Sequence, residues 1–128
     1  MPTYVTLAVD DVARATRFYR VFLGRHPTRQ REDHTFFDLD GPVLALFERG
    51  AMEQASGLPL GQTGAMALSW NVESKQAVSE IVKRAVEAGA GTGRPTHRTP
   101  WGAWAAWLTD PDGHIWEIVW PPPLPPAG

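Results

Sequence analysis

The stretch that decides the fold is residues 3–24, TYVTLAVDDVARATRFYRVFLG. Its first seven residues place every second side chain on one apolar face, which predicts a half-buried strand. A helix then begins at a cap supplied by Asp10 or Asp11, and Gly24 ends it. The apolar side chains of this helix recur at helical spacing, and they are Val12, Ala15, Phe18, Tyr19, Phe22 and Leu23.

Two short apolar runs follow this strand and helix, beyond a polar loop at residues 25–33. The runs are residues 35–39 and 43–47, and the Asp40-Gly41-Pro42 turn between them predicts a hairpin. Pro42 must lie at the start or edge of its strand, because proline has no N–H to donate. Residues 49–64 contain four Gly and one Pro, which predicts an irregular connecting segment.

The second half of the chain repeats this plan. Residues 65–72 predict a strand. A helix is then predicted to begin at a cap supplied by Ser74 and to end at Gly89. Residues 103–109 and 115–120 predict two strands joined by a turn at 110–113. The helix carries its apolar side chains on one face, at Val78, Ile81, Val82, Ala85 and Val86.

The repeated order predicts an α+β protein with one domain at residues 1–120. Module one covers residues 1–50, a linker covers 51–64, and module two covers 65–120. The proline-rich tail, residues 121–128, is expected to be extended or disordered where the chain leaves the sheet. An SH3-type ligand is the alternative reading of its composition.

Composition limits the function classes. A 128-residue chain with 43% hydrophobic and 20% charged residues fits one soluble domain, and no apolar run approaches the roughly 20 residues of a membrane span. The absence of cysteine excludes thiolate chemistry. Together with the lack of room for a secretory signal, it makes a cytoplasmic location the default.

The net charge of −2 gives no general basis for binding nucleic acid or membranes. Six arginines between residues 14 and 31 predict a solvated helix face and loop.

Several short motifs in a fixed order resemble one known superfamily. They are VDDV at 9–12, Phe18-Tyr19, Leu23-Gly24, ALS at 67–69, Trp101-Gly102 and DPDGHIWEI at 110–118. In this order they resemble the vicinal oxygen chelate superfamily, which contains glyoxalase I, extradiol dioxygenases, fosfomycin-modifying enzymes and bleomycin-binding resistance proteins. The likeness spans residues 3–120. It implies two βαβββ modules that form a glyoxalase-like curved sheet with a ligand cavity, and a homodimer.

The resemblance also implies where metal ligands would lie in a metal-dependent member. Those positions fall on Tyr4, at or near Ala45, on Ala65 and on Glu117. Only Glu117 suits a divalent ion, so a metal is possible but disfavoured. The four histidines do not supply the missing metal ligands, and they are His26, His34, His97 and His114. His114 is three residues from Glu117, which on a strand points the two side chains to opposite faces.

Glu117 therefore has three open interpretations. Alternation places its side chain with Ile115 and Val119, opposite Trp116 and Ile118. A carboxylate on a mostly apolar face is costly unless it is paired or reaches solvent. Glu117 could contact a ligand as an acid or base, make a structural hydrogen bond or arginine pair, or bind a metal.

Tryptophan is abundant in module two. Those on or beside its strands include Trp70, Trp101, Trp104, Trp107 and Trp116. This suits a pocket for a planar or apolar molecule, although filling the core or a dimer interface is the alternative. Trp104 and Trp107 point to opposite faces of one strand, and Trp116 is expected in the core. The predicted ligand contacts are Trp101, Trp107, Trp70, Phe37, Phe47 and Tyr4.

Three function classes follow. The first is a metal-independent small-molecule-binding protein of the antibiotic-resistance kind, and it is favoured, although no residue identifies the ligand. A cationic drug such as bleomycin would require an acidic groove, and the sequence has no acidic concentration. The second is a metal-dependent lyase or dioxygenase, and the third a metal-free isomerase, epimerase or lyase with Glu117 as general base.

Overall fold

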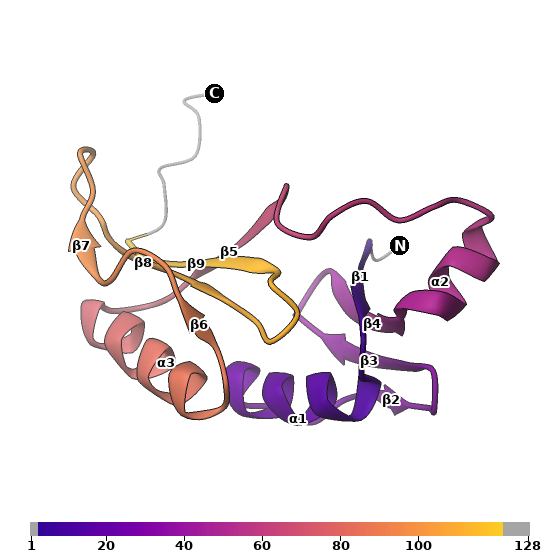
Figure 1. Ribbon diagram of the computed structural model, residues 1–128. Coiled ribbons are helices and arrows are strands. Elements are labelled where there is room, and N and C mark those ends of the chain that lie inside the picture. Colours follow the sequence, from indigo (N-terminus) through magenta and orange to yellow (C-terminus); the bar gives the residue numbers. More distant parts are fainter. Residues whose placement is uncertain (1–2, 122–128) are drawn as a thin grey trace. The chain divides into compact units, whose positions relative to one another are not determined.

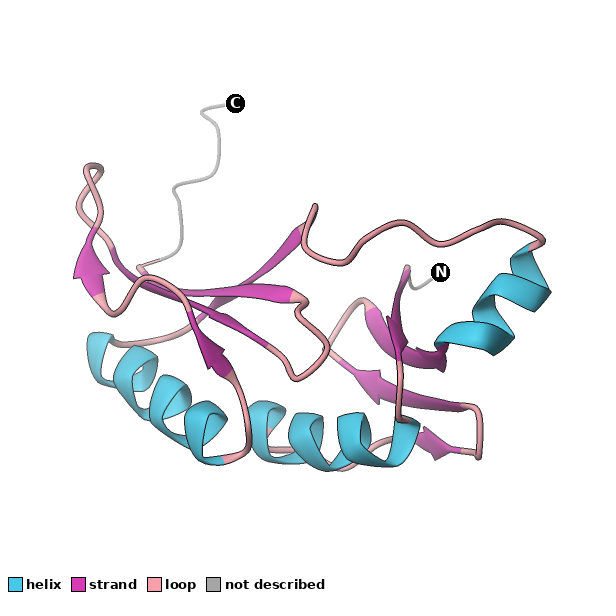
Figure 2. Cartoon of the chain, viewed as in Figure 1, coloured by secondary structure: helices cyan, strands magenta, loops and turns pink. Residues whose placement is uncertain are grey.

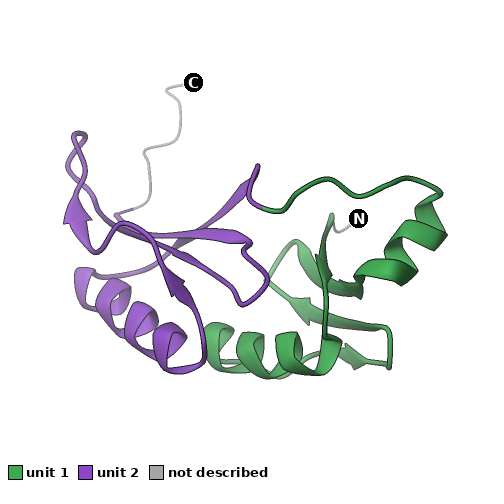
Figure 3. Cartoon of the chain, in the orientation of Figure 1, with its two compact units in different colours: residues 1–63 green, residues 64–128 purple. Residues whose placement is uncertain are grey.

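The computed structural model describes residues 3–121, and the chain divides into two compact units, residues 1–63 and 64–128 (Figure 3). The first unit contains β1 (Tyr4–Val9), α1 (Val12–Leu23), β2 (Arg29–Gln30), β3 (His34–Asp38), β4 (Val43–Glu48) and α2 (Arg49–Ser56). The second contains β5 (Ala67–Asn71), α3 (Lys75–Glu87), β6 (Gly91–Thr92), β7 (His97–Arg98), β8 (Trp104–Thr109) and β9 (Ile115–Trp120) (Figure 1). The predicted α+β class and strand-helix-strands plan are confirmed. The tail from residue 122 lies outside the described residues.

Sheet 1, in the first unit, has the strand order β1-β4-β3-β2, with β1 and β4 parallel and the other pairs antiparallel. Helix α1 packs on one face of this sheet, where Phe37 lies 6.3 Å from Tyr19 between ring centroids. Both side chains are fully buried, as are Leu44 and Leu46. The alternate side chains of the same strands therefore point away from α1.

The ends of α1 follow from its sequence. The side chain of Asp11 accepts a hydrogen bond from the Arg14 backbone N at 3.0 Å, so Asp11 is the cap rather than Asp10. Gly24 ends the helix in the left-handed region, with φ 68°. Inside the unit, the Thr16 hydroxyl donates to the Val12 carbonyl and lies 2.8 Å from the Thr35 hydroxyl, which ties α1 to β3.

Helix α2 corrects the prediction of an irregular segment after residue 48. The Glu48 carboxylate accepts hydrogen bonds from the backbone N of Gly50 at 3.0 Å and of Ala51 at 2.7 Å, so it caps the helix. Gly57 closes it with φ 71°. Because α2 packs against β4 and β1, this part of the expected linker belongs to the first unit.

Sheet 2, in the second unit, has the order β5-β9-β8-β6, with β7 also paired to β8 (Figure 2). As in sheet 1, its one parallel pair, β5 with β9, joins the first and last strands of the module. Helix α3 covers one face: Lys75 Nζ lies 3.7 Å from the ring centroid of Trp104, and Arg84 lies 5.9 Å from that of Trp70. Ile118 is fully buried on this face.

Three two-residue strands, β2, β6 and β7, lie outside the strands that the sequence predicts. They are held by pairing with β3 or β8, which no local sequence pattern predicts.

The ends of α3 agree with the sequence. The predicted Ser74 cap is confirmed by a 3.0 Å hydrogen bond from the backbone N of Ala77, and Gly89 follows the last turn with φ 113°. Among the described residues, no helix is long and apolar enough to cross a membrane.

Candidate ligand-binding groove

A groove of about 610 Å³ lies on the face of sheet 1 that points away from α1. Strand register explains its lining, because Thr6, Ala45 and Phe36 are direct neighbours across β1, β4 and β3. We call this feature the sheet 1 groove. Its lining residues are Tyr4, Thr6, Arg29, Asp33, His34, Phe36, Ala45 and Phe47.

Phe36 is the centre of an aromatic cluster in the sheet 1 groove. The Tyr4 ring lies 5.4 Å from it between centroids in a T-shaped arrangement at 77°, and the His34 ring lies 5.0 Å away. Phe47 continues the cluster at 6.4 Å from His34. Tyr4 is 52% exposed, so the cluster presents apolar ring surface toward solvent.

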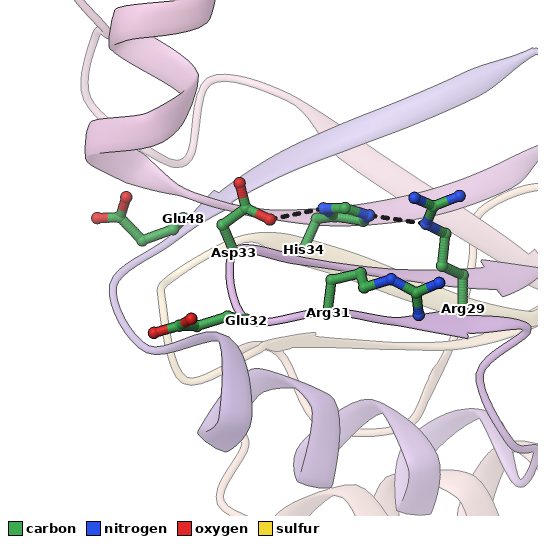
Figure 4. A pocket seen from close by; sticks show the side chains of 6 residues that line it. All are labelled: Arg29, Arg31, Glu32, Asp33, His34 and Glu48. Carbon is green, nitrogen blue, oxygen red and sulfur yellow. Dashed lines mark hydrogen bonds and ion pairs between the residues drawn. The ribbon is translucent and has the colours of Figure 1, made fainter.

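Three polar side chains that also line the groove, Asp33, His34 and Arg29, form a hydrogen-bonded chain. Figure 4 shows this chain with its two interactions dashed. Asp33 Oδ1 lies 2.7 Å from His34 Nδ1, and Arg29 Nε donates to His34 Nε2 at 3.0 Å. Since an arginine can only donate, Nε2 must accept, and the ring proton is therefore on Nδ1 and directed at Asp33. His34 is thus held on both sides.

A second, more polar pocket of about 700 Å³ shares this chain of three side chains and is lined in addition by Arg31, Glu32 and Glu48. The Glu48 carboxylate is engaged at the start of α2, and the Arg31 Nη1 donates to the Gln30 carbonyl at 3.0 Å. In this pocket Glu48 and Arg31 already have hydrogen-bond partners, whereas the sheet 1 groove holds the aromatic surface.

On sheet 2, the face that points away from α3 carries a different set of side chains. Ser69, Glu117 and Trp107 are direct neighbours across β5, β9 and β8, and we call them the sheet 2 row. The Ser69 hydroxyl donates to Glu117 Oε1 at 2.8 Å, while Glu117 and Trp107 are half-buried. Glu117 therefore has a hydrogen-bond partner within the sheet, and its roles in contacting a ligand or a metal stay predictions.

The structure separates the predicted contact residues. Tyr4 and Phe47 line the sheet 1 groove, and Trp107 lies beside Glu117 in the sheet 2 row. Trp101 is 54% exposed in the loop before β8. Two positions are corrected because their strand parity turns them toward the helices, and these are Phe37, under α1, and Trp70, under α3. Trp116 is buried, as predicted.

Sequence reasoning missed five groove-lining residues, Thr6, Arg29, Asp33, His34 and Phe36. The available signal was alternation on β3, which places His34 and Phe36 on one face and Thr35 and Phe37 on the other. Arg29 had no comparable signal, because the two-residue strand that positions it is set by pairing with β3.

The residues at the family metal positions do not fit a divalent ion. Tyr4 and Ala45 line the groove, and Glu117 is bonded to Ser69. The third position is corrected from Ala65, which lies before β5, to Ala67, because Tyr4 and Ala67 each begin their strand seven residues before the helix cap. Within residues 3–121, no group of three or more His, Asp or Glu side chains could hold a metal. Alanine offers no side-chain donor, and the unionised phenol of tyrosine is a poor ligand for such an ion.

A protein-family model for the glyoxalase/bleomycin resistance protein/dioxygenase superfamily matches residues 2–118. The chain belongs to this superfamily. A glyoxalase-related enzyme from Fulvimarina pelagi is similar at 31% identity and a TM-score of 0.90, over 100% of this chain and 94% of that one.

Two further members of the superfamily fold share less sequence. A family enzyme from Burkholderia phytofirmans PsJN has 21% identity and a TM-score of 0.80, covering 91% of this chain and 95% of that one. A lactoylglutathione lyase from Agrobacterium tumefaciens has 24% identity and a TM-score of 0.74, covering 93% and 92%. These two show the fold alone. No curated protein matches the chain.

Proposed function

We propose that this superfamily member binds a small, planar, largely apolar molecule in the sheet 1 groove and does so without a catalytic metal. The observation that carries the proposal is the aromatic cluster around Phe36, which lies on an open face of the sheet and not in the core. Aromatic rings contribute large contact area and prefer edge or offset-stacked partners, so a planar ligand suits them.

The dimensions of the groove support this proposal. Small-molecule sites are typically about 300–1,000 Å³, mostly apolar, with a few polar groups that fix orientation. The groove volume of about 610 Å³ falls inside that range, and its apolar lining comes from Tyr4, Phe36, Ala45 and Phe47. The hydroxyls of Tyr4 and Thr6 supply polar groups for a neutral ligand.

The donor set supports the metal-free part of the proposal. A divalent ion with open positions for substrate needs several His or carboxylate ligands, and the parallel strand pair of sheet 1 offers Thr6 beside Ala45. The equivalent pair of sheet 2 offers Ser69 beside Glu117. Binding in the groove should therefore not depend on added metal.

Calorimetric titration with 2-naphthamide, a neutral planar probe, tests the proposal. The full chain is stripped of metal with a chelator and titrated alone, then with Ni²⁺, Zn²⁺, Mn²⁺ or Fe²⁺. We expect saturable one-to-one binding with a dissociation constant of about 1 mM or tighter, from the usual free energy per ligand atom. The constant should change by less than about twofold when metal is added.

Two outcomes would count against it. Binding that requires one of the metals would show that the donor set has been misjudged. An absence of saturable binding in every condition would remove the groove from consideration as a site for planar molecules.

A further inference from the structure

Arg29 holds a position in the sheet 1 groove that the binding of a neutral molecule does not explain. Its Nε donates to His34, and its guanidinium carbon lies 5.9 Å from the centroid of the Phe36 ring. The two Nη groups make no hydrogen bond with any described residue. Four N–H donors therefore remain available beside the aromatic cluster.

We propose that Arg29 binds the carboxylate of the ligand, so that the groove takes a planar apolar carboxylate, such as an arylcarboxylic acid. This inference rests on the proposed function and narrows its ligand class. A guanidinium presents parallel N–H groups in a fixed plane that matches the two oxygens of a carboxylate. The ring of the ligand would then lie against Phe36 while its carboxylate meets the Nη groups.

The neighbouring side chains hold Arg29 in this position. Asp33 accepts the Nδ1 proton of His34, which turns the Nε2 lone pair toward the Arg29 Nε. The side chain of arginine loses considerable rotamer entropy when it is fixed, and the bond to His34 supplies part of that ordering before a ligand arrives. His34 and Asp33 are therefore positioning residues for Arg29.

Arg31 provides an internal contrast, because it carries the same charge two residues along the chain. Its Nη1 donates to the Gln30 carbonyl, and it lines the polar pocket but not the sheet 1 groove. It has no aromatic ring contact among the described residues. A general attraction between arginine and an anion would use both residues, whereas a carboxylate site on the groove would use Arg29 alone.

Charge at the groove is compatible with an anion. The acidic side chain in its lining is Asp33, and that carboxylate is directed to His34. Glu32 and Glu48 line the polar pocket instead, where Glu48 is bonded to the first turn of α2. Arg29 thus faces the aromatic cluster with its charge uncommitted to a carboxylate.

The test compares 2-naphthoate with 2-naphthamide, which has the same ring and nearly the same shape but no charge. For the unaltered chain we expect naphthoate to bind about tenfold more tightly than naphthamide. Arg29→Gln should weaken naphthoate about tenfold more than it weakens naphthamide, so that the preference for the charged probe is lost. Arg31→Gln should change both by less than about twofold, and Arg29→Lys should weaken naphthoate to an intermediate extent.

Circular dichroism and thermal unfolding of each variant establish that it is folded. Equal weakening of naphthoate by Arg29→Gln and Arg31→Gln would overturn the inference in favour of general charge attraction. Equal affinity of the unaltered chain for the two probes would also overturn it and leave the proposed function intact. If neither probe binds, for example because a second copy of the chain covers the groove, the proposed function fails and the inference fails with it.

Discussion

The two modules share a backbone plan and differ in what they display on it. Thr6 and Ala45 are neighbours on the parallel pair β1 and β4, and Ser69 and Glu117 are neighbours on β5 and β9. Thr6 lies five residues before the cap of α1 and Ser69 five before the cap of α3, so the pairs are equivalent. Around the first pair lies an aromatic groove with an arginine, and around the second a row of Ser69, Glu117 and Trp107.

This difference shows that the repeat constrains the fold and not the chemistry. The face toward each helix must be apolar in both modules, because it forms the core. The opposite face is only partly apolar: in module two Ala105 and Val119 are buried there beside the sheet 2 row. At the equivalent positions Thr6 with Ala45 and Ser69 with Glu117, the two modules carry different side chains. A fold match alone therefore cannot assign a shared activity to the two equivalent positions.

The largest expected effect separates the two faces of sheet 1. Phe37→Ala should lower the free energy of unfolding by about 3–5 kcal/mol, because it leaves a cavity under α1. Phe36→Ala, on the groove face, should cost only about 1 kcal/mol, since that side chain is half-buried. Urea unfolding followed by far-UV circular dichroism measures both. Equal costs would mean that the assignment of the two faces is wrong.

Ligand affinity should depend on the groove face of sheet 1, which contributes less to stability than the face under α1. Phe36→Ala should weaken 2-naphthamide by about tenfold, which is about 1.4 kcal/mol and within the range for an aromatic contact. Trp107→Ala, at the centre of the sheet 2 row, should change that affinity by less than about twofold. A larger effect from Trp107 would move the site to module two.

The modules also differ after their last strand. In module one β4 is followed by helix α2, whereas within residues 3–121 no helix follows β9. Glu48→Gln keeps the size of the side chain but removes its charge from the helix N-terminus, and should destabilise α2 by about 1 kcal/mol. Hydrogen exchange at the amides of Gly50 and Ala51 should accelerate. Unchanged exchange would indicate that packing against β4 and β1 alone holds the helix.

The smallest effects are expected in the sheet 2 row. Ser69→Ala removes one hydrogen bond to a half-buried carboxylate, so the free energy of unfolding should fall by about 1 kcal/mol or less. Glu117→Gln should leave 2-naphthamide affinity within about twofold of the unaltered chain. Loss of ligand binding in either variant would show that this row contributes to the site.

The sequence predicted the features that depend on local patterns. Alternation and helical spacing identified β1, α1, α3 and the two hairpin strands of each module, and the cap at Ser74 was correct. Helix α2 was missed because Gly50 lies in its first turn and glutamate is not a common cap residue. Its cap and its packing come from β4, which a local pattern does not reveal.

The candidate site was predicted less well than the fold. The abundance of tryptophan favours module two as the site, whereas parity within β3 separates Phe36, on the groove face, from Phe37, under α1. The hydrogen-bond chain of Asp33, His34 and Arg29 depends on the β2–β3 pairing, which brings residues five apart into contact. Such pairing is tertiary information, and no periodicity in the sequence encodes it.

The most direct test of the central claim, a metal-free ligand site on sheet 1, is to map 2-naphthamide binding by NMR. Backbone amide shifts of the metal-stripped chain should change at Thr6, Phe36, Ala45 and Phe47, and those of Ser69 and Glu117 should not move. Addition of Zn²⁺ should leave this pattern unchanged. Shifts centred on Ser69 and Glu117, or shifts that appear only with Zn²⁺, would contradict the account.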